Sequence, residues 1–136
     1  MVRVDVEDIL RSTLEALDGE HWGEPDADAT SLVRECHRLR KVPIADLSVG
    51  DLRVLLIQRI GTEWLTPLAL DRLHDDPLAG ESYSGDLLNA VLRATEGYWA
   101  SHPADVMSLW AVREALEQLR GDADQFLARD DWPAFG

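Results

Sequence analysis

Hydrophobic residues recur every three or four positions along most of the chain, which is the spacing of one face of an α-helix. The first such stripe consists of Val6, Ile9, Leu10, Thr13, Leu14 and Leu17. It predicts one helix that begins after Asp5 as its N-cap and stops at Gly19. A second stripe, over residues 32–39, predicts a helix capped near Thr30 and closed before Pro43, because the residue before a proline disfavours helical backbone.

Two further helical stripes occupy the middle of the chain. Ser48 and Asp51 have the spacing of a capping box, with Asp in place of the usual Glu, and open a predicted helix that ends at Gly61. The next stripe covers residues 65–73. Pro67 must lie in the first turn of that helix or kink it, since an interior proline removes a backbone hydrogen bond and costs about 3 kcal/mol.

The C-terminal half carries the clearest helical pattern. A helix that starts at Ser84 or Gly85 has apolar residues at helical spacing as far as Trp99. Another is capped at residues 101–103 and runs to Gly121, with a short helical segment over 122–129. Trp99 and Trp110 fall on these stripes, so both are expected in the core.

The pattern as a whole predicts an all-α fold. No run of alternating β-branched residues indicates a strand. We expect residues 1–136 to form a single compact domain of about six helices in an irregular bundle. Residues 130–136 are expected to form an irregular tail, whose Trp132 and Phe135 dock on the body.

Composition restricts the class of protein. The chain has 136 residues, of which 46% are hydrophobic, so it can bury a core without cross-links. Cys36 is its one cysteine, which excludes an internal disulfide and an all-cysteine metal site. No apolar run approaches the ~18 residues of a membrane span. Acidic residues at positions 5, 7 and 8 are unlike a signal peptide, so a cytoplasmic location is expected.

Net charge restricts the partners. The chain has 26 acidic and 13 basic residues, for a formal net charge of −13. Phosphates would be repelled, so neither nucleic acid nor an anionic membrane is an expected partner, and a basic protein is favoured instead. The basic residues cluster at Arg34, Arg38, Arg40 and Lys41, and we expect them to pair internally with acidic helices.

Catalytic motifs are weak. His74-Asp75 is similar to the metal-binding pair of HD-type phosphohydrolases, but two more ligands would be needed, for instance His37 and Asp105. The alternative is that His74 lies in the last turn of a helix, where a partly positive imidazole favours the helix dipole. There is no H-E-x-x-H or C-x-x-C motif, and we expect no catalytic residue, cofactor or metal.

Several short motifs occur in an order that resembles one known family. They are Trp22-Gly23-Glu24-Pro25, residues 36–43, 47–53, 57–61 and 67–70, and Asp76-Pro77-Leu78 followed by residues 84–92. Together they resemble the immunity proteins of contact-dependent growth inhibition (CDI), known as CdiI, over roughly residues 15–100. The family usually has Tyr-Pro-Gly-Asp-Leu-Leu where this chain has Ser84 after Tyr83.

The resemblance implies an immunity protein that is not an enzyme. Such a protein binds and neutralises a cognate toxin domain, often a nuclease, delivered by contact or secretion. The partner would be the C-terminal domain of a CdiA-like or other polymorphic toxin, and a basic surface on it would suit the net charge of this chain. One alternative is an acidic helical adaptor for another basic protein, and the HD-type hydrolase is less favoured.

The candidate toxin-binding residues surround the loop after the fourth predicted helix, which is acidic, rich in turn formers and has one aromatic anchor. They are Asp71, Asp75, Asp76, Glu81, Tyr83 and Asp86. Gly85 and Asp86 have an alternative role, which is to shape the start of the next helix. A second candidate surface is the acidic N-terminal third, with Glu20, Glu24, Asp26 and Asp28.

Overall fold

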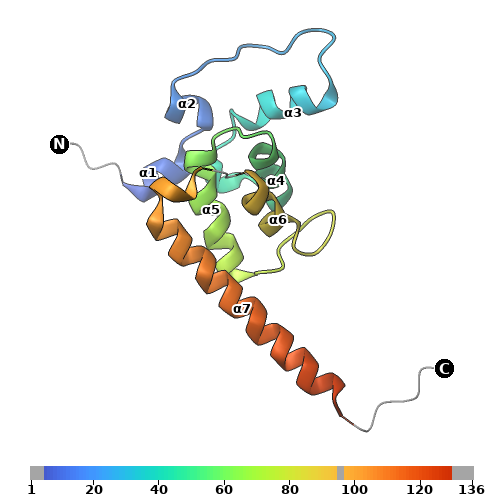
Figure 1. Cartoon of the computed structure of the whole chain (residues 1–136). Helices are drawn as coiled ribbons and strands as arrows, with labels where there is room; N and C mark the ends of the chain where they lie inside the picture. The colour runs from blue at the N-terminus through green and yellow to red at the C-terminus, as the bar shows by residue number, and fades with distance from the viewer. Residues whose placement is uncertain (1–4, 95–96, 130–136) are drawn as a thin grey trace.

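The chain folds into helices joined by turns, as its periodicity predicts (Figure 1). The computed structural model describes residues 5–94 and 97–129, and within these ranges no strand forms, so the predicted all-α class is confirmed. The α-helices are α1 Val6–Arg11, α2 Leu14–Asp18, α3 Ser31–Leu39, α4 Val49–Ile57, α5 Thr62–Asp75, α6 Asp86–Ala94 and α7 Pro103–Leu127. Two 3₁₀ turns are η1 Ile44–Asp46 and η2 Trp99–Ser101.

Leucines of α4, α5 and α6 form the centre of the core. Helix α4 packs against α5 and α6, and α7 lies along α5 (Figure 1). The large apolar side chains of these helices that are fully buried are Leu52, Leu55, Leu56, Leu65, Leu70, Leu73, Leu87 and Val91. Each contributes roughly 1.5–3 kcal/mol by leaving water, so this cluster is the main source of stability.

The N-terminal stripe forms two short helices, so the prediction of one helix over 6–17 was wrong. The backbone is extended at Ser12 and Thr13. Ser12 O accepts a hydrogen bond of 2.9 Å from Ile44 N, and Thr13 forms an isolated bridge with Pro43. Pairing with this distant segment interrupts the helix. Helix α2 then starts in a different orientation, in which Leu14 is completely buried.

The predicted caps that depend on near neighbours are present. Asp5 caps α1, Thr30 caps α3, and Gly19 ends α2 in the left-handed conformation. Ser48 and Asp51 form the reciprocal capping box of α4, with hydrogen bonds of 2.9 and 3.1 Å.

The limits of α4 and α5 differ from the predicted ones. Helix α4 ends at Ile57, and Gly61, which was expected to end it, is instead the N-cap of α5 at φ 67°. Pro67 lies inside α5 and not in its first turn.

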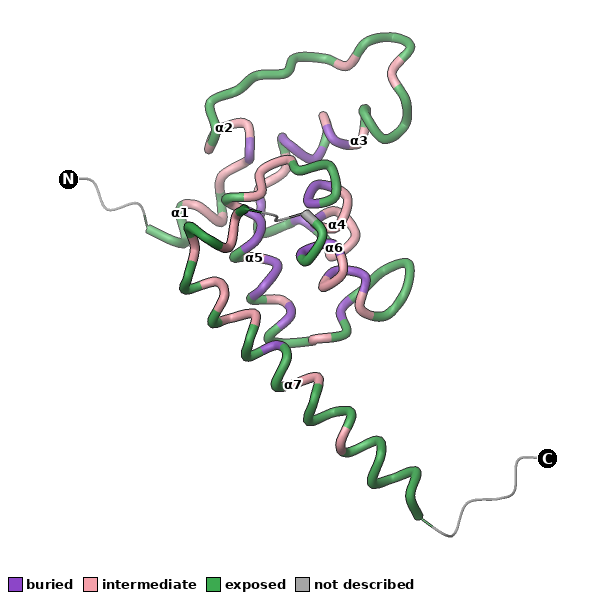
Figure 2. The backbone as a smooth tube through the Cα atoms, in the orientation of Figure 1, coloured by how far each residue is buried: buried purple, intermediate pink, exposed green. Residues whose placement is uncertain are grey.

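Helix α7 is longer than predicted and projects beyond the body (Figure 1). It continues through Gly121, where a stop was expected. Val112 is its one buried residue, and its C-terminal half is exposed around nearly its whole circumference (Figure 2). Trp99 packs partly buried against the core, whereas Trp110 is 52% exposed, because it lies one position past the inward stripe of Leu109 and Val112.

The tail over residues 130–136, with Trp132 and Phe135, lies outside the described residues. Among the described helices none combines the length and apolar character that a membrane crossing requires.

Candidate functional site

Arg34 on α3 and Lys41 after α3 hold the long loop over residues 19–30. Arg34 donates hydrogen bonds of 3.2, 2.7 and 3.2 Å to the carbonyls of Asp26, Ala27 and Ala29. Arg38 pairs with Glu35, and Lys41 lies 3.7 Å from the carboxylate of Glu24. These side chains are therefore used within the chain.

Arg40 makes the most buried of these contacts. It is 3% exposed and donates two hydrogen bonds to Asp18 and one of 2.6 Å to the carbonyl of Glu20. Its guanidinium also lies 4.3 Å from the centre of the Trp22 ring. The bonds from Arg40 lower the pKa of Asp18 despite the opposing effect of burial. The expectation that the basic cluster pairs internally with acidic helices is met by Arg40, which bonds Asp18 of α2, and within α3 by Arg38, whereas Arg34 and Lys41 contact the loop instead.

The loop between α5 and α6 is built around the carboxylate of Asp86, which is fully buried. It accepts backbone hydrogen bonds from Glu81, Ser82 and Tyr83, the shortest being 2.8 Å from Ser82 N, and lies 3.8 Å from Arg53 Nε. Burial alone would raise the pKa of Asp86, but these N–H groups and the Arg53 charge outweigh it and lower the pKa. Asp86 is thus unavailable to a partner and positions the loop.

Two glycines permit this tight loop. Gly85 has φ 86°, a left-handed conformation that side chains disfavour, directly before α6. A Cβ at Gly80 would lie only 2.0 Å from the carbonyl oxygen of Tyr83, so no larger residue can occupy that position without moving the backbone.

The remaining predicted residues near the loop are exposed. Tyr83 is 51% exposed, and its hydroxyl accepts a hydrogen bond of 2.6 Å from Asn89 Nδ2. The Glu81 carboxylate lies against Gly50 in the first turn of α4. A Cβ atom placed on Gly50 would be only 1.4 Å from Glu81 Oε2, so no side chain fits there unless Glu81 moves. Asp75 and Asp76 lie at the end of α5. Within the described residues no basic side chain pairs with these three carboxylates.

Asp71 is on the same helix but borders another feature. It lines a groove between α1, α5 and the start of α7. The structure therefore groups Asp75, Asp76, Glu81 and Tyr83 around the loop and places Asp71 one helical turn before Asp75. The four acids of the second candidate surface, at positions 20, 24, 26 and 28, are exposed in the loop held by α3.

The residues of the hydrolase alternative are not brought together. His74 is exposed on α5. His37 lies on α3, with its Nδ1 3.1 Å from the carbonyl of Gly23, and Asp105 on α7 accepts a hydrogen bond from the hydroxyl of Tyr98. Over residues 5–94 and 97–129 no three histidine, cysteine or carboxylate side chains are placed to hold a metal ion.

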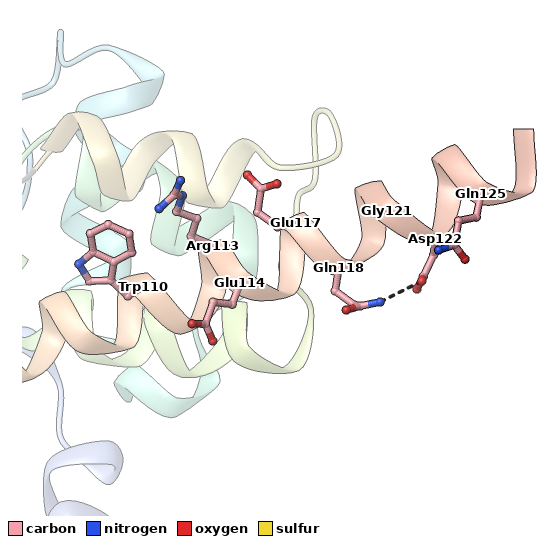
Figure 3. A pocket seen from close by; sticks show the side chains of 8 residues that line it. All are labelled: Trp110, Arg113, Glu114, Glu117, Gln118, Gly121, Asp122 and Gln125. Carbon is pink, nitrogen blue, oxygen red and sulfur yellow. Dashed lines mark hydrogen bonds between the residues drawn. The ribbon is translucent and has the colours of Figure 1, made fainter. Parts of the chain in front are cut away.

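The exposed face of α7 carries a shallow concave strip (Figure 3). Its lining residues are Trp110, Arg113, Glu114, Glu117, Gln118, Gly121, Asp122 and Gln125. All of them belong to one helix, so within residues 5–94 and 97–129 no second element forms an opposite wall around a small substrate. The guanidinium of Arg113 lies 5.0 Å from the centre of the Trp110 ring, and Gln118 donates to Asp122.

Comparison with known proteins gives one finding about the family. A family model described as CDI immunity proteins matches residues 16–109, more than two thirds of the chain. The matched segment extends from α2 into α7 and includes the loop between α5 and α6. No curated protein and no solved structure matches the chain.

Proposed function

Because the chain belongs to the CDI immunity proteins, which neutralise a cognate toxin, we propose that it acts by stoichiometric binding that covers the active site of the toxin, without catalysis. The proposed partner is the C-terminal domain of a CdiA-like or other polymorphic toxin. We propose a nuclease with a basic surface, since an enzyme that handles phosphates must attract them.

One observation carries this proposal, namely the distribution of unpaired charge. The formal net charge is −13, and the basic cluster of Arg34, Arg38, Arg40 and Lys41 is occupied by contacts within the chain. The carboxylates of Asp75, Asp76 and Glu81 are exposed and have no basic partner in the part of the chain that the structure describes. An exposed acidic surface of this kind attracts a basic protein over long range and disfavours acidic competitors.

The proposed contact surface is the exposed part of the sequence-predicted set. It comprises Asp71, Asp75, Asp76, Glu81 and Tyr83, with Asp86 holding the loop from within. Tyr83 supplies an exposed aromatic ring of the kind that often dominates binding energy. Its hydroxyl is already bound to Asn89, which limits the rotamer entropy lost on binding.

Co-expression with the toxin domain encoded beside this chain tests the proposal. We expect cells that express the toxin domain to survive only when they also express this chain, and a one-to-one complex of the two proteins to co-purify. Toxin activity should fall to zero at one molar equivalent, which distinguishes stoichiometric blocking from catalysis. Absence of a complex, together with death of the cells, would contradict the proposal.

A variant pair tests the surface. Glu81→Gln/Tyr83→Ala removes one charge and the aromatic anchor, and we expect it to raise the Kd at least about tenfold. Glu114→Gln removes one exposed charge on α7 and is the control, with an expected change of less than about threefold. Equal affinity of both variants would exclude the loop as a contact surface.

A further inference from the structure

A groove with an apolar floor lies between α1, η1, α5 and the start of α7, and has a volume of about 450 Å³. This volume is within the range of sites that hold a few side chains or a small ligand. The apolar residues that line it include Val6, Ile9, Leu10, Trp64, Pro67 and Leu68. Val6 is 67% exposed, and Trp64 and Leu68 are only partly buried, so apolar surface remains accessible in the groove.

The rim of this groove is acidic. Glu63, Asp71 and Asp105 line it, and among the lining residues that the structure describes there is neither lysine nor arginine. Asp105 accepts a hydrogen bond from the hydroxyl of Tyr98, whereas Glu63 and Asp71 are exposed and unpaired with any basic side chain in the described ranges. An unpaired carboxylate beside apolar surface is a position where an incoming cation is attracted with little competition from the chain itself.

The aromatic end of the groove lies close to two of the acidic residues. The ring of Tyr98 stacks on His102 at 3.8 Å between centroids. Burial raises the pKa of the Tyr98 hydroxyl first, and the bond to Asp105 and the negative charge of Glu63 raise it further. The charges on the rim therefore act on groups inside the groove as well as on the solvent.

We propose that this groove docks a segment of the toxin in which an apolar side chain is flanked by lysine or arginine. The inference rests on the proposed function and adds a second contact region to it, because Asp71 joins the groove to the acidic end of α5. The apolar side chain would lie on Trp64 and Leu68, and the flanking cations would pair with Glu63 and Asp71. Such central apolar anchors with charged surroundings are typical of strong protein interfaces.

A second copy of this chain is a poorer occupant. Each copy has a formal net charge of −13, and a two-fold interface across the groove would bring the same acidic rims together. Like charges in that arrangement oppose association. A basic partner removes this repulsion and supplies the missing counter-charges.

A pair of variants with equal charge change tests the groove. Glu63→Gln/Asp71→Asn removes two rim charges with almost no change of shape, and both side chains are exposed, so folding should be retained. Glu114→Gln/Glu117→Gln removes two exposed charges on α7 and controls for the loss of long-range attraction. If the wild-type chain binds the toxin domain, we expect the groove variant to raise Kd at least about tenfold, mainly through faster dissociation, and the control to change it less than about threefold. Equal values for the two variants would overturn the groove proposal and leave the proposed function standing.

A peptide experiment that needs no toxin distinguishes failure of the groove proposal from failure of the proposed function. If the wild-type chain binds no toxin domain, the proposed function fails and a peptide decides about the groove. Acetyl-Arg-Phe-Arg-amide, titrated into ¹⁵N-labelled protein, should shift the indole signal of Trp64 and the amide signals of Glu63 and Asp71. Acetyl-Glu-Phe-Glu-amide should not, and Glu63→Gln/Asp71→Asn should weaken the shifts. Absence of shifts with the basic peptide would overturn the groove proposal, as would a wild-type dimer in sedimentation whose stability the same variant changes.

Discussion

The guanidinium of Arg40 donates hydrogen bonds of 2.7 and 3.0 Å to the two carboxylate oxygens of Asp18, which lies 22 residues earlier in the chain. The same group donates to the carbonyl of Glu20 and covers the ring of Trp22. One side chain after α3 thereby fixes the end of α2 and the beginning of the long loop. Residues 18–24 are otherwise exposed, so the order of this part of the molecule rests largely on that ion pair.

Loss of this pair should be costly. We expect Arg40→Met, which keeps an apolar stem, to lower the free energy of unfolding by about 2–3 kcal/mol, because Asp18 and the Glu20 carbonyl lose their donor. Arg38→Met is the control, since the Arg38–Glu35 pair is exposed and worth less than about 1 kcal/mol. Urea denaturation of both variants measures the difference, and equal losses would contradict the special role of Arg40.

The same pair makes stability depend on pH. The pKa of Asp18 lies below its ordinary value of 3.8 in the folded state, so the charged form is favoured by folding. Its contribution is therefore complete above that value and is lost as the pH falls through the folded-state pKa. We expect the stability difference between wild type and Asp18→Asn to be constant above about pH 5 and to shrink below about pH 4. A difference that persists unchanged at about pH 2 would contradict the assigned shift.

The buried carboxylate of the α5–α6 loop is expected to matter for stability and binding together. Asp86→Ala leaves three backbone N–H groups and Arg53 without their acceptor, and should lower the free energy of unfolding by about 3 kcal/mol. Glu81→Ala, five positions earlier but exposed, should change it by less than about 0.5 kcal/mol. Thermal unfolding followed by circular dichroism compares them, and a near-normal midpoint for Asp86→Ala would refute the anchoring role.

Thr66 offers a substitution that should increase stability. Its side chain is fully buried in α5, and within the described ranges its hydroxyl has no hydrogen-bond partner. Thr66→Val keeps the shape and removes the unsatisfied group, so we expect a gain of about 1 kcal/mol. Thr30→Val should instead cost about 1 kcal/mol, because the Thr30 hydroxyl caps α3. A loss at both positions would show that the Thr66 hydroxyl is bound after all.

Salt should act on the rate of toxin binding. With a net charge of −13, association with a basic domain should slow at least about tenfold between about 20 and 500 mM salt, since the Debye length is ~10 Å at 0.1 M. Dissociation should change little. Stopped-flow mixing of the two proteins measures both rates. An association rate independent of salt would remove the electrostatic account while leaving the family role intact.

The sequence predicts features that depend on neighbouring residues. The caps at Asp5 and Thr30 and the capping box at Ser48 and Asp51 involve residues two or three positions apart, so local pattern is sufficient. The all-α class follows from the periodicity of the apolar stripes.

Features that depend on distant residues are not predicted by the local sequence pattern. The break between α1 and α2 arises from pairing with Pro43, and nothing near Thr13 indicates it. Helix α7 passes through Gly121 because a glycine there is tolerated, at a cost of about 1 kcal/mol relative to alanine. In the candidate site, Glu81 and Asp86 are both acidic, yet one is exposed and the other fully buried, because the loop folds back onto only one of them.

Helix α7 is one continuous element with two thermodynamic segments. Its 25 residues extend roughly 38 Å, and the inward stripe meets the body only as far as Leu116. Amide hydrogens before that residue should exchange only when the core opens, whereas those after it belong to a helix too short to be stable alone in water. We expect exchange to accelerate abruptly near Leu116, although the hydrogen-bond ladder itself has no interruption.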